Sequence, residues 1–231
     1  NGAIIKIQDT FAFLPKSLMI PGERCIVGYS IRALLKEVLH EPRNENQLIL
    51  DRVSGDFLKA LFELEIPEIF EHLVEIKALA RVAGYKSKIV VASNDKNIDP
   101  VGTCVGVGGA RIKPILRELG SEKIDIMAVS ISKEDFVKDA LRPAVVNNVQ
   151  VDGSVARVWI DSDQRSLAIG KLGKNIALAC EITGLSIELM KSEVMAGQSL
   201  ADILDIQEVT GGNDRTESKN DLFDTIDEDG E

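Results

Sequence analysis

The chain begins with short apolar runs separated by polar turns. Residues 3–7 and 11–14 are rich in the β-branched and aromatic residues that favour strands. Two more apolar-rich runs, residues 29–38 and 47–50, flank a polar, proline-containing turn. Several short strands joined by turns predict a small β-barrel in residues 1–52.

After residue 52 the apolar residues follow a helical period. Ser54 is a candidate N-cap for a helix whose apolar positions lie in residues 57–64. Two β-like runs, residues 74–78 and 88–92, then flank Gly84 and predict a hairpin. The change of period predicts that an α/β unit follows the barrel.

The most informative pattern is an internal repeat, in which residues 99–120 align with residues 163–184. Each copy predicts, in order, a helix, a Gly-x-x-Gly turn, a second helix that ends at a glycine, and a strand. A helix at residues 133–141 and a hairpin made by residues 145–151 and 155–160 precede the second copy. The pattern therefore predicts two copies of one α/β unit.

A Gly-x-x-Gly turn between two helices can bind a phosphate. The first backbone N–H groups of the second helix have no partner within it and carry partial positive charge. Because glycine has no Cβ, a phosphate can approach the turn closely. Apolar residues beside the turn, such as Ile169 and Ile176, can line a groove for unstacked bases. These features predict binding of single-stranded RNA through turns of the KH type.

The two turns are not equivalent. In the second turn, Lys171 lies between the glycines, Lys174 follows them and Arg165 lies upstream, so three cations can attract phosphates. The first turn has no cation between its glycines. We therefore expect the first turn to contribute less affinity, through Arg111 and Lys113. The residues predicted to contact RNA are Gly106, Val107, Gly108, Gly109, Arg111, Lys113, Arg165, Gly170, Lys171, Leu172, Gly173 and Lys174. Apolar residues at helical spacing are interpreted as core: Leu167, Ile176, Leu178 and Ile182.

The net charge of −10 does not exclude RNA binding, because it is concentrated at the end of the chain. From Asp205 onward, ten acidic and two basic residues give −8, which leaves −2 for residues 1–204. A short helix is expected at residues 200–206. The acidic segment after it has few apolar residues and is predicted to be disordered. It could mimic RNA phosphates or keep the chain in solution.

Other classes of protein find little support in the sequence. The glycine-rich stretch at residues 102–109 follows a polar loop, so it does not fit a dinucleotide-binding fingerprint, and no Walker or hydrolase motif occurs. The three cysteines and two histidines have no metal-ligand spacing, which predicts no metal or cofactor. No apolar run approaches the about 20 residues that span a bilayer, and no signal peptide is evident. We predict a cytoplasmic, monomeric protein that is not an enzyme.

The residues around both turns resemble a known family. Residues 94–111, which include Asp99-Pro100-Val101-Gly102, resemble the first KH domain of the bacterial NusA family, and residues 164–175 resemble its second. Residues 14–23 are similar to the barrel that precedes them in the family, an OB-fold. Two departures are Gly108, where the family usually has a basic residue, and a barrel that starts late, without its first strand or the family's N-terminal polymerase-binding domain.

The resemblance implies a transcription elongation factor that binds nascent single-stranded RNA and RNA polymerase. Such a factor modulates pausing, termination and antitermination, with other elongation factors as possible partners. In the barrel, Phe11 and Phe13 are candidates for base stacking, with core packing as the alternative. A protein-interaction scaffold whose KH folds have lost RNA contact is the alternative function, suggested by the missing cation in the first turn.

The predicted fold class is multidomain, α/β plus β. It comprises an N-terminally truncated OB-fold barrel, two tandem type II (prokaryotic) KH domains and an acidic disordered tail. The expected boundaries are residues 1–52, 53–131, 132–206 and 207–231.

Overall fold

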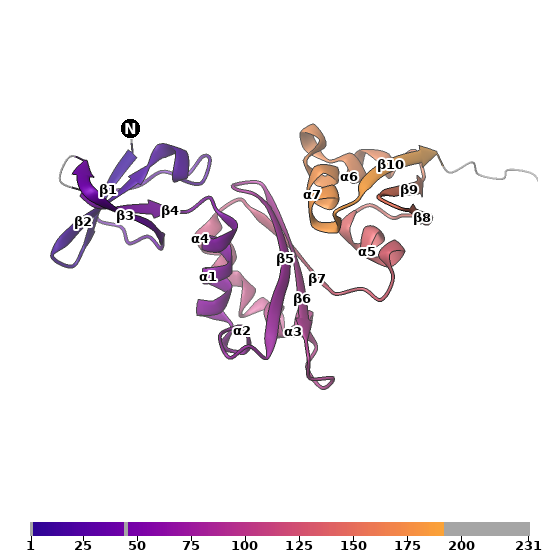
Figure 1. Cartoon of the computed structure of the whole chain (residues 1–231), viewed down its shortest axis with the longest axis horizontal. Helices are drawn as coiled ribbons and strands as arrows, with labels where there is room; N and C mark the ends of the chain where they lie inside the picture. Colours follow the sequence, from indigo (N-terminus) through magenta and orange to yellow (C-terminus); the bar gives the residue numbers. More distant parts are fainter. Residues whose placement is uncertain (1, 44–45, 192–231) are drawn as a thin grey trace, which may run out of the picture. The chain divides into compact units, whose positions relative to one another are not determined.

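The computed structural model describes residues 2–43 and 46–191, whose elements are labelled in Figure 1. The predicted helix at residues 200–206 and the acidic tail lie outside the described residues. The N-terminal strands are β1 (Gly2–Ile7), β2 (Thr10–Pro15), β3 (Leu34–Arg43) and β4 (Asn46–Asp51), with a short 3-10 helix, η1 (Lys16–Leu18). They form one sheet in the order β1-β2-β4-β3.

This sheet is open within the described residues, because its two outer strands, β1 and β3, do not pair with each other. The partial OB-fold barrel expected from the sequence is therefore not confirmed by these strands. The third strand also starts later than the apolar run at residues 29–38 predicts. A turn in which Gly28 has φ +89° and the Tyr29 N–H donates to the Ile26 carbonyl precedes it, so the chain enters the ladder only at Leu34.

The first α/β unit has the order predicted for it. Its elements are α1 (Gly55–Glu65), α2 (Pro67–Phe70), β5 (Val74–Val82), β6 (Lys86–Ser93), α3 (Pro100–Val105), η2 (Val107–Gly109), α4 (Ile112–Leu119) and β7 (Lys123–Ala128). Strand β6 is central, antiparallel to β5 and parallel to β7. The expected N-cap is confirmed, because the Ser54 hydroxyl accepts a hydrogen bond from the Phe57 N–H at 3.2 Å.

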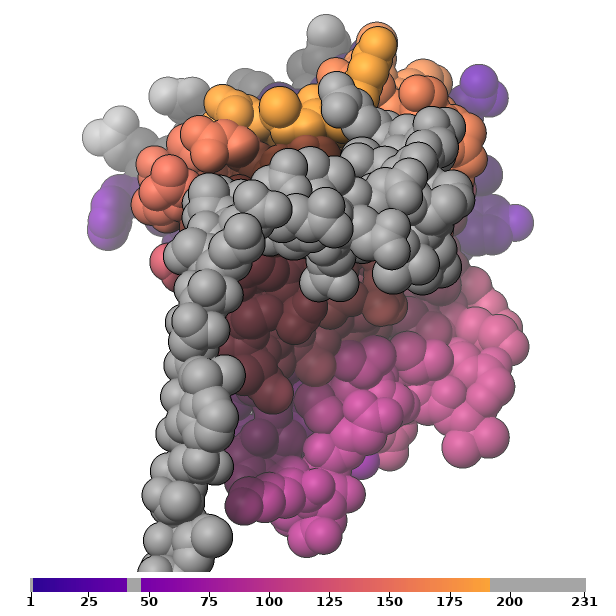
Figure 2. All heavy atoms as spheres, turned by 90° about the vertical axis from the view of Figure 1, so that its right-hand side faces the viewer, coloured from indigo at the N-terminus to yellow at the C-terminus, as the bar shows by residue number. Residues whose placement is uncertain are grey.

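The second unit repeats this topology, which confirms the internal repeat. Its elements are α5 (Lys133–Ala140), β8 (Asn148–Asp152), β9 (Val155–Ile160), α6 (Arg165–Ile169), η3 (Lys171–Gly173), α7 (Lys174–Thr183) and β10 (Ser186–Lys191). Strand β9 is central, antiparallel to β8 and parallel to β10. Figure 2 faces this unit, with β10 in the lightest orange.

The two units share a buried apolar surface. Helices α1, α2 and α4 supply the core of the first unit, around Phe57, Phe62 and Ile115. The core of the second unit also includes Ala80, Val90 and Met127 of the first sheet, and α7 packs against β5 and β6. Because the apolar residues of one sheet are buried against the helices of the next unit, the second unit is held directly against the first.

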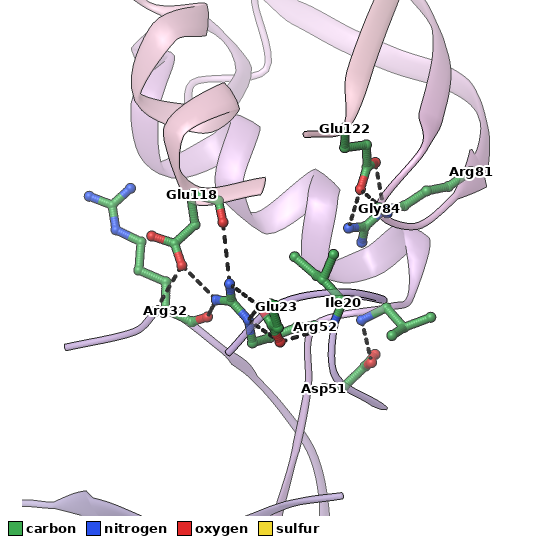
Figure 3. A network of polar contacts seen from close by, with 10 residues as sticks. Ile20, Glu23, Arg32, Asp51, Arg52, Arg81, Gly84, Glu118 and Glu122 are labelled. Atoms are coloured by element: carbon green, nitrogen blue, oxygen red, sulfur yellow. Dashed lines mark hydrogen bonds and ion pairs between the residues drawn. The ribbon is translucent and has the colours of Figure 1, made fainter. Parts of the chain in front are cut away.

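A buried arginine joins the N-terminal sheet to the first α/β unit (Figure 3). The Arg52 guanidinium, 4% exposed, donates to the Glu23 carboxylate at 2.8–3.2 Å and also to the Glu118 carboxylate. Its Nη2 reaches the Glu118 carbonyl at 3.2 Å. Two carboxylates from two domains therefore hold one buried cation, which satisfies its donors without water.

A second buried pair lies within the first unit. Arg81 Nε and Nη2 each donate to the Glu122 carboxylate at 2.9 Å, and the Arg81 and Glu122 side chains are almost fully buried. Glu122 also accepts from the Ser87 hydroxyl at 2.6 Å and the Gly84 N–H at 2.9 Å. This carboxylate therefore fastens the β5–β6 turn to the segment that precedes β7.

The three cysteines differ in exposure, which leads to a labelling prediction. Burial raises the pKa of the Cys104 thiol to about 12, whereas Cys25 and Cys180 are partly exposed. Because the thiolate is the reactive form, iodoacetamide at pH 8 should label Cys25 and Cys180 well before Cys104 in the native chain, as measured by mass spectrometry. In denaturant the three should react alike. Rapid native labelling of Cys104 would contradict the placement.

Candidate nucleic-acid interface

Both Gly-x-x-Gly turns connect two helices, and their backbones are nearly identical. Gly106 has φ +72° and ψ +165°, and Gly170 has φ +71° and ψ +179°. In each turn this glycine ends the first helix by donating to a carbonyl four residues earlier, at 2.8 Å in the first copy and 2.9 Å in the second. The repeat in sequence is therefore a repeat in backbone geometry.

The third position of each turn is left-handed. Gly108 has φ +60° and ψ +20°, and Leu172, its counterpart, has φ +54° and ψ +30°. A residue with a Cβ in this region costs about 1 kcal/mol relative to glycine. The second turn therefore holds a strained leucine, exposed at 85%, at its tip. Such strain is found where the surrounding structure fixes a functional conformation.

The first glycine of each turn is required by packing within the protein. A Cβ on Gly170 would lie 2.6 Å from Cβ of Asn175, and one on Gly106 would lie 2.9 Å from Cγ of Arg111. A Cβ on Gly108 or Gly173 would meet no atom within 4 Å. The close approach that a phosphate needs is thus available at Gly108 in the first turn and at Gly173 in the second.

Two adjacent backbone N–H groups in each turn have no hydrogen-bond partner. Within the described part of the chain, those of Val107 and Gly108 make no hydrogen bond, and neither do those of Lys171 and Leu172. The side chain of Val107 is 96% exposed, so water or a ligand can reach this turn freely. Paired unsatisfied N–H groups at the start of a helix are the donors that bind a phosphate.

The structure divides the predicted cations into two groups. Lys171 and Lys113 are exposed and have no ion-pair partner among the described residues. The Lys174 ammonium lies 4.8 Å from the centre of the Tyr85 ring. The second group has structural partners. Arg111 donates to Glu68 at 2.8 Å and to the Thr103 carbonyl at 3.0 Å, and Arg165 donates to the Leu189 carbonyl at 3.1 Å.

The four apolar residues interpreted as core differ in burial. Leu178 and Ile182 are buried in the core of the second unit and Ile176 is partly buried against it. Leu167 differs, because it is 44% exposed beside the turn. It lies in the middle of α6, the five-residue helix that leads into the turn, three residues before Gly170.

The two phenylalanines of the N-terminal sheet lie on the same face of β2, since residues two apart point the same way along a strand. Phe11 is 52% exposed and Phe13 is half-buried, while Ala12 and Leu14 on the opposite face are fully buried. Phe11 is thus the more accessible for stacking.

Asn175, which the sequence did not single out, supports the second turn. Its Nδ2 lies 3.1–3.3 Å from the carbonyls of Leu141, Leu167 and Ala168. Its Oδ1 accepts from Lys86 Nζ at 3.1 Å, so a lysine of the first unit holds a residue of the second. Its counterpart in the first copy, Arg111, binds the Thr103 carbonyl in the same way. Only the alignment of the two copies could have suggested this shared role.

Lys86 and Lys88 lie at the surface shared by the two units. Both approach one carboxylate oxygen, Asp125 Oδ2, at 2.7 and 2.8 Å. Burial lowers the pKa of Lys88, and the hydrogen bond and charge of Asp125 oppose that shift. Lys88 also donates to the Arg142 carbonyl at 3.3 Å. Two ammonium groups therefore share one carboxylate at this surface.

Other kinds of site find no geometric support in residues 2–43 and 46–191. No group of three His, Cys, Asp or Glu side chains there is placed to hold a metal ion. In the same residues, no helix has the length and apolar character needed to cross a membrane.

Two α/β units with the order helix–strand–strand–helix–helix–strand, each with an exposed Gly-x-x-Gly turn, define a tandem KH-domain protein. Family comparison agrees. The NusA-like first KH domain matches residues 52–129 and the NusA-like second KH domain matches residues 133–196, together more than half of the chain. The chain belongs to the NusA family.

Curated relatives named transcription termination/antitermination protein NusA match most of the chain. That of Thermus thermophilus is 40% identical over 185 residues, covering 79% of this chain and 48% of the relative. That of Halalkalibacterium halodurans is 41% identical, with the same coverage. That of Rickettsia prowazekii is 34% identical over 223 residues, covering 90% of this chain and 44% of its own length. The chain thus spans about half the length of the relatives it matches.

Among solved structures, the crystal structure of APE1850 aligns with 58% of this chain and 95% of its own, at 21% identity and a TM-score of 0.41. A score this low supports no argument about the arrangement of domains.

Proposed function

We propose that this chain binds single-stranded RNA through its two KH turns and acts with RNA polymerase on pausing, termination and antitermination. The observation that carries the proposal is the second turn, where Lys171 and Leu172 have unpartnered N–H groups and Lys171 and Lys174 add two cations to the same short segment. The name of the curated relatives, transcription termination/antitermination protein NusA, supports the link to termination and antitermination. The role is noncatalytic, in the cytoplasm, and needs no second copy of the chain.

The N-terminal sheet supports a finer proposal, that it is an OB-type sheet which extends the RNA-binding surface. Its order β1-β2-β4-β3 has one parallel pair, β2 with β4, between two antiparallel pairs. This is the arrangement of the last four strands of a five-stranded OB-fold. Phe11 is exposed on it and suited to stack on a base.

The test is RNA affinity after the second turn is made acidic. We expect Lys171→Asp/Leu172→Asp to reduce the affinity of the full chain for a pool of random single-stranded RNA 12-mers by at least roughly tenfold, since two carboxylates then face the phosphate. Fluorescence anisotropy at several KCl concentrations gives both affinity and its salt dependence. The slope of log affinity against log salt should become shallower, because fewer counterions are released.

The matched control is Val107→Asp/Gly108→Asp in the first turn, which adds the same two carboxylates. We expect a smaller loss there, because that turn has no cation between its glycines. Circular dichroism must show that both variants are folded. Unchanged affinity and salt dependence in a folded second-turn variant would contradict RNA binding by that turn and would favour the protein-interaction scaffold.

A further inference from the structure

The second KH sheet has one exposed face. Its three strands direct one set of alternate residues, such as Val149, Val158 and Ile187, into the core beneath α5 and α7. The residues of the other set point away from that core, and Met190 among them is 40% exposed. We call this side the outer face. Its residues are Asn148, Gln150, Arg157, Trp159, Glu188 and Met190.

The corresponding face of the first KH sheet is covered. Ala80, Val90 and Met127 lie on it, and none of them is more than 6% exposed. They belong to the same buried cluster as Leu178 and Ala179 of α7, the helix that packs on β5 and β6. A helix of the second domain therefore occupies the outer face of the first sheet.

The pairing registers show that the two outer faces are equivalent. Met127 lies opposite Val90 in the first sheet. Met190, its counterpart in the internal repeat, lies opposite Trp159 in the second. Each pair joins the central strand to its parallel neighbour, so the two methionines have the same place in the two domains.

A cross-strand ion pair occupies the same place on both faces. Lys88 lies opposite Asp125 and binds it at 2.8 Å. Two residues before Met190, Glu188 lies opposite Arg157, at 4.0 Å. In the first sheet the lysine also donates to the Arg142 carbonyl, in the segment that leads into the second domain. The face that holds α7 and the face that is open thus share their pattern of residues.

The open face carries larger apolar side chains than its equivalent. Val90 is 3% exposed under α7, whereas Trp159, in its place, is partly exposed beside the exposed Met190. Aromatic residues and methionine are enriched at protein–protein interfaces, and tryptophan is among the residues that most often anchor them. The second sheet therefore presents an apolar anchor where the first sheet holds a helix.

We propose that the outer face of the second KH sheet, centred on Trp159 and Met190, is a docking surface for an amphipathic helix of a partner protein. The helix lies on this sheet as α7 lies on the first, with an apolar stripe that has the spacing of Leu178, Ala179 and Ile182 in α7. The proposal does not depend on RNA binding.

The test uses the full chain and a synthetic peptide with the α7 sequence, residues 174–184. An isolated helix of this length is unstable, so the peptide carries Ala177→Lys, joined to Glu181 by a lactam, and Cys180→Ser against oxidation. Both lactam positions are exposed on α7. Because Trp159 is the single tryptophan, its fluorescence reports the face directly. The peptide should shift its emission to shorter wavelength, with a dissociation constant of about 0.1 mM.

Two protein variants and one peptide variant locate the binding. Met190→Glu should weaken it at least roughly tenfold, since the carboxylate would be buried unpaired under the helix. Leu64→Glu is the matched control, because Leu64 is 64% exposed on α1 of the first domain, and it should bind like the unmodified chain. The peptide with Ala179→Glu should not bind, because its apolar stripe is interrupted.

Each contrary result overturns the proposal. One is the absence of a saturable shift up to about 1 mM peptide, and another is an equal loss in folded Met190→Glu and Leu64→Glu. A shift of Trp159 emission with the RNA 12-mers and not with the peptide would assign the face to RNA. A shift with chain concentration alone would assign it to a second copy. The peptide titration contains no RNA, so its failure leaves the RNA-binding function standing.

Discussion

Replacing Glu122 by glutamine should lower the free energy of unfolding of the first KH domain by about 3–5 kcal/mol, the range for breaking a buried ion pair on one side. The Glu122 carboxylate accepts from Arg81, Ser87 and the Gly84 N–H, and neither its side chain nor that of Arg81 is more than 3% exposed. A neutral amide leaves the buried guanidinium uncompensated and turns an NH₂ group toward these donors. Urea denaturation followed by circular dichroism measures the loss.

Two features of the chain sharpen this experiment. Glu75→Gln is the same substitution in an exposed pair with Lys77 on β5, and it should leave unfolding nearly unchanged. Trp159, the single tryptophan, lies on β9 of the second domain and reports that domain separately. Glu122→Gln and Glu75→Gln variants of equal stability would show that the buried pair contributes nothing to the fold.

The second large effect is expected from Gly170→Ala. The new Cβ would lie 2.6 Å from Cβ of Asn175, on a residue whose φ is +71°. Asn175 cannot move aside easily, because its side chain binds Lys86 and the carbonyls that end α6. We expect a loss of about 2–4 kcal/mol from overpacking and left-handed strain together. The displaced turn should also lose RNA affinity, measured by anisotropy.

Gly173→Ala separates the two contributions. Gly173 has φ +73°, but a Cβ there meets no atom within 4 Å. It should therefore show the left-handed strain alone, about 1–2 kcal/mol. If Gly170→Ala is no less stable than Gly173→Ala, then close packing against Asn175 does not explain the first glycine of the motif.

The comparison of the two turns changes how the first one is interpreted. From the sequence, Gly108 removes a cation that the family usually has. In the structure it occupies the left-handed position that Leu172 occupies under strain. Gly108 thus relieves about 1 kcal/mol of strain while leaving the unpartnered N–H groups of its turn unchanged. The first turn keeps the backbone donors and lacks only the cation.

Much of the fold could be predicted because its signals are local. Ser54 caps its helix by a bond to a residue three positions away, and Gly153 makes the β8–β9 turn with φ +59°. Alignment of the two copies predicted the order of elements in the second KH domain from the first. The late start of β3 was missed, because an apolar run does not reveal which of its residues find a strand partner.

The partners of charged residues could not be predicted in this way. Arg52 was one of several dispersed basic residues in the sequence, and in the structure it is buried between Glu23 and Glu118. Arg111 and Arg165, predicted to contact RNA, direct part of their donors to the protein itself. A guanidinium on a helix can reach a phosphate or a nearby carboxylate, and the choice depends on what the fold brings within about 3 Å.

The sequence by itself determined the repeat, the two Gly-x-x-Gly turns and the inequality of their cations, because these depend on residues close together along the chain. Only the tertiary structure decided that the second turn is supported from the first domain. The Lys86–Asn175 bond joins residues 89 positions apart, and a pocket beside it is lined by Lys123 of the first domain and Lys171 of the second. Such contacts follow from the burial of one domain's sheet against the other's helices, which no local pattern encodes.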